Sequence, residues 1–402
     1  MKNNVYDVLK ERGFIKQTIY DEDLYKMLGE EKVSFYVGFD PTADSLHIGH
    51  YIPIMAMAWM QKYGHTPIAL FGGGTGMIGD PSGRSDMRTM MTPETISKNV
   101  ECFKKQMSRF INFDGENAAI IADNKDWLLN LNYVDFLRDV GVYFSVNKML
   151  TAECYKQRME KGLTFLEFNY MLMQGYDFLV LNEKYNCKLE VGGDDQWSNM
   201  LAGVDLIRRK KQKDAFCLTC TLLLNSEGKK MGKTQKGALW LDENKCPVYD
   251  FYQYFRNVED CKVAECMKLL TFMDLEEIEE LTKYQDERMN AAKERLAFEV
   301  TKLVHGEEKA LLAQKQARAA FGGNEEDMPE FNANGLTAVP DIMVAAGIAK
   351  SKGEARRLIE GGGVSVGDKK LTVNDLTLDE ETLKQGSFVL HKGKKVHVKI
   401  LL

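Results

Sequence analysis

Apolar residues in the first half of the chain form short runs that alternate with longer amphipathic stretches. The runs at 33–39 and 67–71 are nearly continuous and predict buried strands, whereas 50–63 and 94–113 carry apolar positions at helical spacing. Strands that alternate with helices predict an α/β fold with a mostly parallel sheet. Ligands bind such sheets beyond the carboxyl ends of the strands, so the loops there are the expected place for a site.

The pattern changes twice further along the chain. Residues 247–321 are rich in Glu, Lys, Leu and Met and predict an α-helical domain, and the acidic, turn-rich stretch 322–337 is typical of a linker. Residues 338–402 predict a small α+β domain, made of helices at 342–346 and 352–360 and strands at 364–366 and 371–373. Ser351 and Glu354 have the spacing of a capping box for the second of these helices.

Composition is that of an ordinary globular protein. The chain has 402 residues, of which 44% are hydrophobic and 28% charged, which suits two or three domains. No apolar run approaches the ~18 residues that a membrane-spanning helix needs. The N-terminus is polar and leads into an amphipathic helix, so we expect a cytoplasmic protein without a membrane partner.

The eight cysteines are scattered, which predicts reduced core thiols rather than a disulfide framework. Cys217 and Cys220 have the spacing of half a zinc site, for which Cys261 and Cys266 are a conceivable second half. The first pair lies in the strand-like run 216–224, where residues three apart point to opposite faces. We therefore expect no zinc.

Charge argues for a local rather than a general contact with nucleic acid. The net charge is −6, but residues 338–402 hold 11 Lys and Arg against 8 Asp and Glu. Lys352, Arg356 and Arg357 can share the outer face of a predicted helix. Taken alone, these three residues fit an RNA contact and a solvated helix face equally well.

Two short motifs carry candidate chemistry. His47 and His50 stand at the start of an apolar helix, where the helix dipole favours anions, although a lone His-x-x-His is more often a metal pair or a coincidence. Lys230 and Lys233 flank Gly232 on a turn-rich loop, where ammonium groups can close on a polyphosphate. Together the motifs predict adenylyl transfer.

A glycine-rich loop at 74–79 matches the dinucleotide-binding fingerprint by its letters. That fingerprint needs a helix to continue from the third glycine, whereas Asp80 and Pro81 follow here and predict a turn. No Lys-Ser/Thr pair follows the last glycine, so the loop is not a Walker motif either. Backbone amides, the Asp80 carboxylate and the Arg84 cation suit a zwitterion such as an amino acid.

The two motifs resemble the signatures of the class I aminoacyl-tRNA synthetases, with Gly232 and Thr234 where that family often has serine. The stretch 36–50 resembles the version found in bacterial tyrosyl-tRNA synthetases. Further matching segments follow in the order of that family, at 79–83, 170–177, 192–197 and 229–234. The end of the chain resembles an S4-type RNA-binding domain, so the resemblance covers essentially the whole sequence.

The resemblance implies a tyrosine–tRNA ligase that forms tyrosyl-adenylate from ATP and L-tyrosine, and then charges the 3′-terminal ribose of tRNA(Tyr). It implies a homodimer, with Mg²⁺ arriving on ATP and no metal site of its own. The implied domains are a Rossmann-like catalytic domain at 1–224, a mobile lysine-signature loop and connection at 225–246, an α-helical anticodon-side domain at 247–321, a linker at 322–337 and an S4-like domain at 338–402.

The resemblance also implies roles for individual residues. The catalytic group is His47, His50, Lys230 and Lys233. The tyrosine-binding group is Tyr36 and Asp177 at the phenolic hydroxyl, with Asp80, Tyr170 and Gln174 at the ammonium. The ATP and adenylate group is Gly38, Asp40, Asp195, Gln196 and Lys233, and the tRNA-binding group is Lys352, Arg356 and Arg357. From spacing alone, Tyr170 and Gln174 would be assigned to a helix packing face.

Three other functions remain open from the residues. A relative that charges tryptophan would share the fold, and Asp177 argues against it. Small-molecule nucleotidylyltransferases also use a His-x-Gly-His turn, but they do not explain an RNA-binding tail. An RNA-binding or splicing factor without charging activity would not need the intact histidines and lysines.

Overall fold

The computed structural model describes residues 4–82, 91–234, 237–320, 328, 330–367, 369–393 and 396–402. The chain forms two compact units, Met1–Cys246 with Val258–Ala292, and Pro247–Asn257 with Lys293–Leu402. Residues 258–292, which the sequence places in a separate helical domain, thus pack with the first unit. The other predicted domain boundaries stay a prediction.

The first unit is built on a sheet with the strand order β1-β6-β5-β2-β3-β4. Neighbouring strands are parallel except β1 and β6, which confirms the predicted parallel α/β fold. The strands are β1 (Ile15–Thr18), β2 (Ser34–Phe39), β3 (Thr66–Phe71), β4 (Ile120–Asp123), β5 (Cys187–Gly193) and β6 (Phe216–Cys220), and a separate pair is formed by β7 (Lys233–Thr234) and β8 (Gly237–Ala238).

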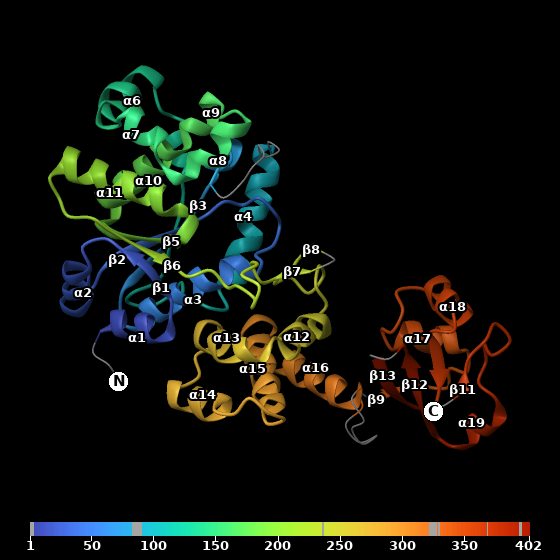
Figure 1. The fold of residues 1–402 in the computed structure, drawn as a ribbon. Helices are drawn as coiled ribbons and strands as arrows, with labels where there is room; N and C mark the ends of the chain where they lie inside the picture. The colour runs from blue at the N-terminus through green and yellow to red at the C-terminus, as the bar shows by residue number, and fades with distance from the viewer. Residues whose placement is uncertain are drawn as a thin grey trace. The chain divides into compact units, whose positions relative to one another are not determined.

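Helices cover both faces of this sheet, with α10 and α11 on one side and α1 and α3 on the other (Figure 1). The helices of this unit are α1 (Val5–Arg12), α2 (Asp21–Glu30), α3 (Ile48–Lys62), α4 (Pro93–Met107), α5 (Lys125–Leu128), α6 (Tyr133–Asp139), α7 (Val146–Leu150), α8 (Glu153–Lys161), α9 (Phe165–Phe168), α10 (Tyr170–Tyr185), α11 (Trp197–Lys211), α13 (Val263–Leu270) and α14 (Leu275–Thr282). Short 3-10 helices are η1 (Thr75–Met77), η2 (Gly141–Tyr143), η3 (Asp194–Gln196) and η4 (Asp260–Lys262).

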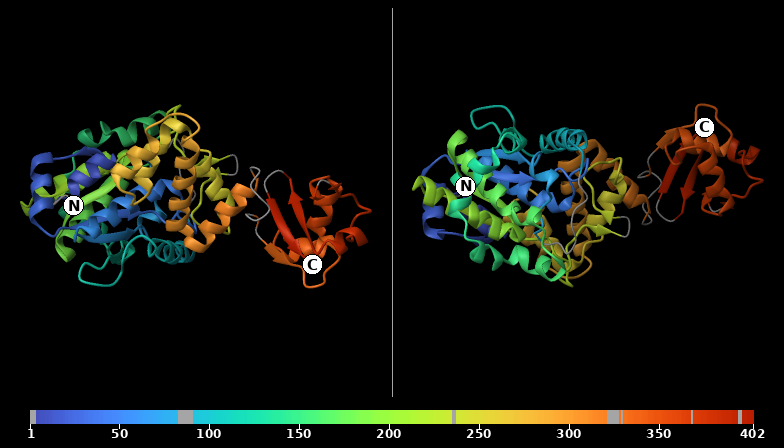
Figure 2. Two further views of the ribbon diagram at one scale, coloured as in Figure 1. Left: turned by 90° about the horizontal axis from the view of Figure 1, so that it is seen from below. Right: turned by 90° about the horizontal axis from the view of Figure 1, so that it is seen from above.

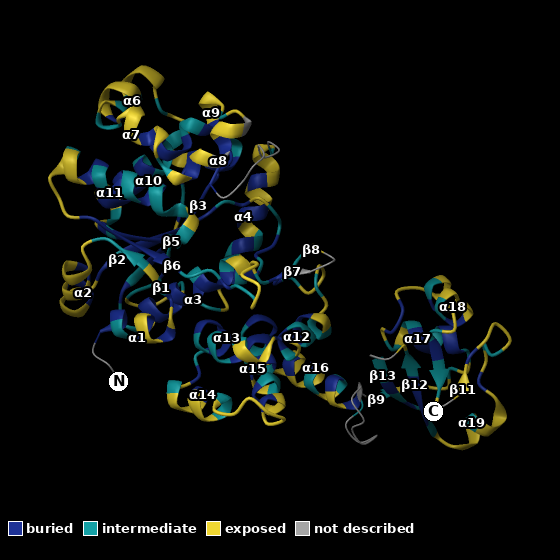
Figure 3. Ribbon diagram, in the orientation of Figure 1, coloured by how far each residue is buried: buried dark blue, intermediate teal, exposed yellow. Residues whose placement is uncertain are grey.

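The core of the first unit lies between the sheet and these helices. Ile68 on β3, Phe178 on α10 and Val204 on α11 are completely buried and belong to one apolar cluster. The inner strands β2, β3, β5 and β6 are accordingly mostly buried, whereas the outer faces of α6, α7 and α9 are exposed (Figure 3). Burial of both faces explains why β2 and β3 are nearly continuous apolar runs in the sequence.

The second unit contains the helices α12 (Val248–Arg256), α15 (Met289–His305) and α16 (Glu307–Ala320), with the start of α15 assigned to the first unit. It also contains a sheet with the order β11-β10-β12-β13-β9. The strands are β9 (Glu330–Asn332), β10 (Val364–Val366), β11 (Lys369–Lys370), β12 (Ser387–Lys392) and β13 (Val396–Leu401), and the helices α17 (Val339–Ala345), α18 (Lys352–Glu360) and α19 (Glu380–Lys384) accompany them. Helices α17 and α18 pack together on one side of this sheet (Figure 2).

Several predicted elements need correction in their bounds. The helix predicted at 94–113 ends at Met107. The strand predicted at 371–373 is absent from the described residues there, because Thr372 donates its backbone N–H and its hydroxyl to Asp375 and turns the chain (2.9 and 2.6 Å). In the predicted linker 322–337, residues 322–327 and 329 lie outside the described part, and 330–332 form β9, which pairs with β13.

The capping box forms only in half. The Ser351 hydroxyl accepts the Glu354 N–H (3.2 Å), but the Glu354 carboxylate accepts the N–H of Lys350 rather than that of Ser351 (2.8 Å). Helix α18 still begins at Lys352, one residue after the predicted cap.

Cys217 and Cys220 are buried in β6, and the eight cysteines are free thiols. Among the described residues, no group of three metal-ligand side chains comes together. No helix in the described ranges is both long and apolar enough to cross a membrane.

Candidate active site

A cavity of about 410 Å³ opens at the carboxyl ends of β2 and β5. Its lining includes each predicted catalytic, tyrosine-binding and adenylate-binding residue except Lys233, namely Tyr36, Gly38, Asp40, His47, His50, Asp80, Tyr170, Gln174, Asp177, Asp195, Gln196 and Lys230. These residues come from segments up to 194 positions apart, which the parallel sheet brings to one edge. The cavity thus gathers the groups that the sequence singled out.

His47 and His50 form the cap of α3. His47 Nδ1 accepts the N–H of Gly49 (3.0 Å), and His50 Nδ1 accepts the N–H of His47 (3.2 Å). Burial lowers the pKa of His47, which favours a neutral ring. Because Nδ1 is an acceptor in this arrangement, the neutral His47 ring carries its proton on Nε2 and can donate it to an anion at the helix N-terminus.

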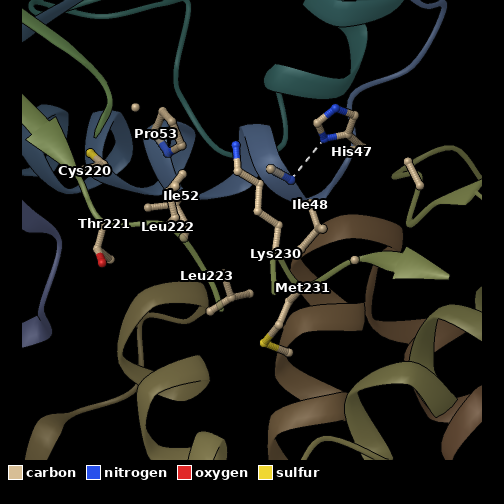
Figure 4. Close-up of a pocket in the computed structure, with 14 residues that line it drawn as sticks. His47, Ile48, Ile52, Pro53, Cys220, Thr221, Leu222, Leu223, Lys230 and Met231 are labelled. Atoms are coloured by element: carbon tan, nitrogen blue, oxygen red, sulfur yellow. Dashed lines mark hydrogen bonds between the residues drawn. The ribbon is translucent and has the colours of Figure 1, made fainter. Parts of the chain in front are cut away.

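The lysine loop approaches the same helix. Lys230 extends toward α3 on the side of His47, and both line a smaller adjoining pocket of about 170 Å³ (Figure 4). Its ammonium lies 3.7 Å from the Asp195 carboxylate. Lys233 begins β7, and its side chain, like Arg84 of the glycine-rich loop, lies outside the described part of the structure.

Gly232 has a left-handed backbone, with φ of +82°, and packs against α3. A Cβ added there would overlap Cγ2 of Ile48. The loop is held in place by the hydrogen bonds Met231 N to Leu223 O (2.8 Å) and Leu239 N to Gly232 O (2.7 Å). This position therefore requires glycine in the observed conformation.

Asp177 is the buried acceptor at the inner end of the cavity. One of its oxygens accepts the indole N–H of Trp127 (2.7 Å), and the other accepts the side-chain N–H of Asn124 (2.9 Å). Burial raises the pKa of Asp177 to about 8, against the effect of these two donors. A carboxylate with an acceptor site left in such a place suits a ligand that brings a hydroxyl donor.

Asn124 is a residue that sequence reasoning missed. Its amide oxygen accepts the N–H groups of Gly74 and Thr75 (2.7 and 3.3 Å), and its amide nitrogen reaches Asp177. It therefore ties the glycine-rich loop to the inner end of the cavity. The only signal was its place directly after β4 at the carboxyl edge of the sheet. Residues 75–77 form a short 3-10 turn, and no helix continues from Gly79 through Ser82, as the rejection of the dinucleotide fingerprint expects.

Glu190 was also missed, although it lies on β5 beside Tyr36 of β2. It is only 2% exposed, and it accepts a hydrogen bond from Gln174 Nε2 (2.9 Å). Burial raises the pKa of Glu190 to about 7. An acidic residue in the middle of an apolar strand was the available signal.

Asp80 and Asp40 add negative charge on the glycine-loop side of the cavity. Asp80 accepts the N–H of Ser82 and the side-chain amide of Gln196 (2.9 and 2.7 Å). Burial, helped by the charge of Asp40, raises the pKa of Asp80 to about 6. The Tyr170 hydroxyl donates to Asp40 (3.2 Å). Tyr170 therefore belongs to the cavity and not to a helix packing face.

The cavity is thus electrically divided. One end presents the imidazoles of His47 and His50 and the Lys230 ammonium, which suit phosphate oxygens. The other end presents buried carboxyl groups such as Asp80 and Asp177, which suit an ammonium and a hydroxyl. Such a site can hold a zwitterion next to a polyphosphate.

In the second unit, the predicted tRNA-binding residues lie on α18. Arg356 and Arg357 are exposed, whereas Lys352 is paired with Asp341 (2.7 Å). Ala355 and Ile359 of the same helix are buried in the core of this part. The basic side chains therefore face solvent, as the pattern predicted. None of the ion pairs between described side chains includes Arg356 or Arg357.

Comparisons with known proteins agree with this geometry. Residues 28–322 match the family model of class I tRNA synthetases (W and Y), and residues 321–400 match the tyrosine–tRNA ligase SYY-like C-terminal domain. The tyrosine–tRNA ligase of Clostridium botulinum strain Hall is 58% identical over 399 residues, or 98% of each chain. That of Clostridium tetani is 56% identical over 407 residues, with both chains fully covered.

A solved structure shows the same fold. A C-terminally truncated mitochondrial tyrosyl-tRNA synthetase from Aspergillus nidulans superposes with a TM-score of 0.71 at 29% identity, covering 79% of this chain and 94% of that one.

Proposed function

We propose that this chain, which belongs to the tyrosyl-tRNA synthetase family of class I tRNA synthetases, activates L-tyrosine with ATP and transfers it to tRNA(Tyr). The observation that carries the proposal is the placement of a buried hydroxyl acceptor, Asp177, and the His47–His50 pair at two ends of one cavity. The acceptor selects the amino acid, and the histidines hold the phosphates.

In the first step the tyrosine carboxylate attacks the α-phosphorus of ATP, and the bond to the β-phosphate oxygen breaks as pyrophosphate leaves. The step needs neither a covalent enzyme intermediate nor a general base, because the nucleophile is already an anion. Catalysis then consists of positioning and of stabilising charge on the leaving group. We assign the second task to His47, His50, Lys230 and Lys233.

Tyrosine is held at the acidic end. Asp177 accepts the phenolic O–H and Tyr36 contacts the same oxygen, while Asp80, Tyr170 and Gln174 hold the ammonium. Phenylalanine would leave the Asp177 acceptor site unpaired in a buried place, which is unfavourable. The same acceptor disfavours tryptophan, whose indole ring has another shape and places its N–H elsewhere.

ATP is held at the adenylate side, by Gly38, Asp40, Asp195 and Gln196. Mg²⁺ enters with ATP, because this ion is usually bound by substrate phosphates with one or two carboxylates in support. The 3-10 helix η3 carries Asp195 at the end of β5, where its carboxylate can accept from the ribose hydroxyls.

In the second step the terminal ribose hydroxyl of tRNA(Tyr) attacks the carbonyl carbon of tyrosyl-adenylate, so that an ester bond to the ribose forms, the bond to the phosphate oxygen breaks and AMP leaves. Arg356 and Arg357 on α18, and Lys352 once it leaves Asp341, supply positive charge for the tRNA backbone. The predicted division into a catalytic domain, an anticodon-side helical domain and an S4-like domain fits this use. We also propose a cytoplasmic location for this chain, which is similar over its whole length to bacterial tyrosine–tRNA ligases.

The proposed homodimer would use the exposed apolar face of α6, η2, α7 and α9. Val134, Val142 and Phe165 are 63%, 71% and 68% exposed there. Large apolar side chains exposed in several elements of one stretch of the chain are costly in water and typical of an interface. Glu167 in α9 is instead buried and paired with Arg158 (2.9 Å), which fixes the backbone that presents Phe165.

Amino-acid-dependent ATP–pyrophosphate exchange, run with each of the twenty amino acids and without tRNA, tests this function. Exchange with tyrosine alone would support the assignment of both ends of the cavity. Exchange with another amino acid would keep the class and overturn the roles of Asp177 and Tyr36. No exchange from folded protein would favour an RNA-binding protein without charging activity.

A further inference from the structure

Three buried polar atoms converge on the inner wall of the cavity without a hydrogen-bond partner among the described residues. They are Tyr36 Oη, Gln174 Oε1 and Glu190 Oε2, and they come from β2, α10 and β5. Buried polar atoms are nearly always paired in folded proteins, so an unpaired set in a cavity indicates a bound partner or a proton that completes it. The reaction assigned above gives no role to Glu190.

Glu190 and Tyr36 lie side by side because their strands pair in the sheet. They are register partners on the parallel strands β2 and β5, so their side chains leave the sheet on the same face. Both line the cavity, with exposures of 2% and 1%. Because Glu190 Oε1 already accepts from Gln174 Nε2, the other carboxyl oxygen is left for the Tyr36 hydroxyl or for a ligand.

We propose that Glu190 is a positioning residue for tyrosine recognition, which in its neutral form donates a hydrogen bond to Tyr36 Oη and so turns the Tyr36 O–H toward the phenolic oxygen of the substrate. Each O–H group then donates to the next oxygen: Glu190 donates to Tyr36, Tyr36 donates to the substrate phenol, and the phenol donates to Asp177. Once Glu190 has lost its proton, its free oxygen accepts the Tyr36 O–H instead, and the substrate oxygen loses that donor. The inference rests on the proposed function, since the phenol belongs to tyrosine.

The surroundings of Glu190 place its proton loss near neutral pH. Burial raises the pKa of its carboxyl group to about 7, and the side chains of Gln174 and Tyr36 both oppose this. The titratable groups that face it are Tyr36 from β2, Asp177 from α10, Cys217 from β6 and Cys187 from its own strand. Burial raises the pKa of each of them.

Asp177 acts in the opposite direction to Glu190. Burial raises the pKa of Asp177 to about 8, and ionisation makes it a better acceptor for the phenolic O–H. A weakening of tyrosine binding between about pH 6 and about pH 8 therefore carries the sign expected for Glu190 and not for Asp177. The thiols of Cys187 and Cys217 stay protonated in this range because burial raises the pKa of both.

The test is the KM for tyrosine in pyrophosphate exchange at about pH 6 and about pH 8. We expect the KM of the wild-type chain to rise about 3- to 10-fold, the factor that corresponds to one neutral hydrogen bond. The rise should be absent in Glu190→Gln, whose amide keeps a donor for Tyr36 at both pH values. It should also be absent in Tyr36→Phe, which has no hydroxyl to turn. Glu183→Gln, which removes an exposed carboxylate of α10, is the matched control and should keep the rise.

The outcomes separate this inference from the function on which it rests. A rise in KM that persists in Glu190→Gln or in Tyr36→Phe overturns the inference and leaves the function intact. A pH dependence of the tyrosine KM that is the same in the wild type and in Glu190→Gln overturns it in the same way, because Asp177 acts equally in both proteins. If the wild-type chain gives no tyrosine-dependent exchange at either pH, both fail. Because the two variants change different strands, a folding defect in one leaves the other to decide.

Discussion

His47 and His50 stack ring on ring at the start of α3, with centroids 4.0 Å apart and planes inclined by 23°. Each ring turns its Nδ1 to a backbone N–H of the helix cap, so the pair is fixed before any ligand arrives. Donors that need no rearrangement are the kind that stabilise developing charge most effectively.

Loss of the His50 or the Lys230 side chain should slow adenylate formation more than it weakens tyrosine binding. We expect His50→Ala and Lys230→Ala to reduce the single-turnover rate of adenylate formation on the order of 10²-fold, because each removes a donor to the leaving phosphates. Lys229→Ala is the matched control, since Lys229 is exposed and paired with Glu227. Rates in both variants equal to that of the control would contradict the assignment.

Asp177→Asn should impair recognition of tyrosine in particular. The amide keeps only one acceptor oxygen for the donors of Trp127 and Asn124, so little acceptor capacity remains for the phenol. We expect the KM for tyrosine, measured at about pH 9 where Asp177 is ionised, to rise about 10- to 100-fold, the range for a hydrogen bond to a charged group. Exchange kinetics with thermal melting as a folding check measure this, and exposed Asp126→Asn is the control. An unaltered tyrosine KM would show that another residue accepts the phenol.

His65 makes the first unit sensitive to acid. It is buried, its Nδ1 accepts the N–H of Val33 (3.2 Å), and burial lowers the pKa of His65 to about 4 from 6.5. Between these values the unfolded chain binds more protons than the folded one, so stability is present above about pH 6.5 and is lost as pH falls. The loss at about pH 5 should be about 2 kcal/mol.

His65→Asn tests that linkage, because the Asn oxygen can accept the same N–H without becoming charged. Denaturant unfolding at about pH 7 and about pH 5 should show a smaller acid loss in the variant than in the wild type. Equal losses in the two proteins would assign the acid sensitivity to other groups.

Phe165→Asp should abolish self-association if the exposed face of α9 is the dimer interface. A charge buried in an apolar interface without a partner is strongly unfavourable. Sedimentation velocity of the wild-type chain should show a dimer, and of the variant a monomer. Tyr284→Asp, at a residue that is 42% exposed on the loop after α14, is the control and should leave the dimer intact. A dimeric Phe165→Asp would place the interface elsewhere.

Loss of Arg356 and Arg357 should weaken tRNA binding. If each side chain neutralises one phosphate, the double variant to alanine should lower the slope of log affinity against log salt by about 2. Filter binding over a salt series measures this slope, and Lys384→Ala on α19, a paired and exposed lysine, is the control. A slope unchanged from wild type would make the α18 face an ordinary solvated surface.

Much of the fold was predictable because burial leaves a clear pattern. Strands β2 and β3 are covered on both faces and read as apolar runs, and α3 begins at the predicted histidines. The misses come from local polar contacts that periodicity does not register. Thr372 turns the chain toward Asp375 where a strand was expected, and residues 330–332 join a sheet through a partner 69 positions away.

The residues of the site also fall into two groups, those that the sequence predicted and those that it did not. Motif residues such as His47 and Asp177 were identified because a family resemblance preserved their order. Asn124 and Glu190 were not, because each owes its place to a partner on another strand or helix and stands in no motif. Contacts of this kind arise only when the strands are laid side by side, so a linear pattern cannot predict them.

Gly232 sets the path of the lysine loop over α3. A side chain at 232 would overlap Cγ2 of Ile48 and would also have to adopt a φ of +82°, so serine, which the family often has there, requires a different course of the loop whatever residue stands at 48. A chimaera that carries a serine-bearing loop in this chain should therefore hold Lys230 at another distance from His47 than the native loop does.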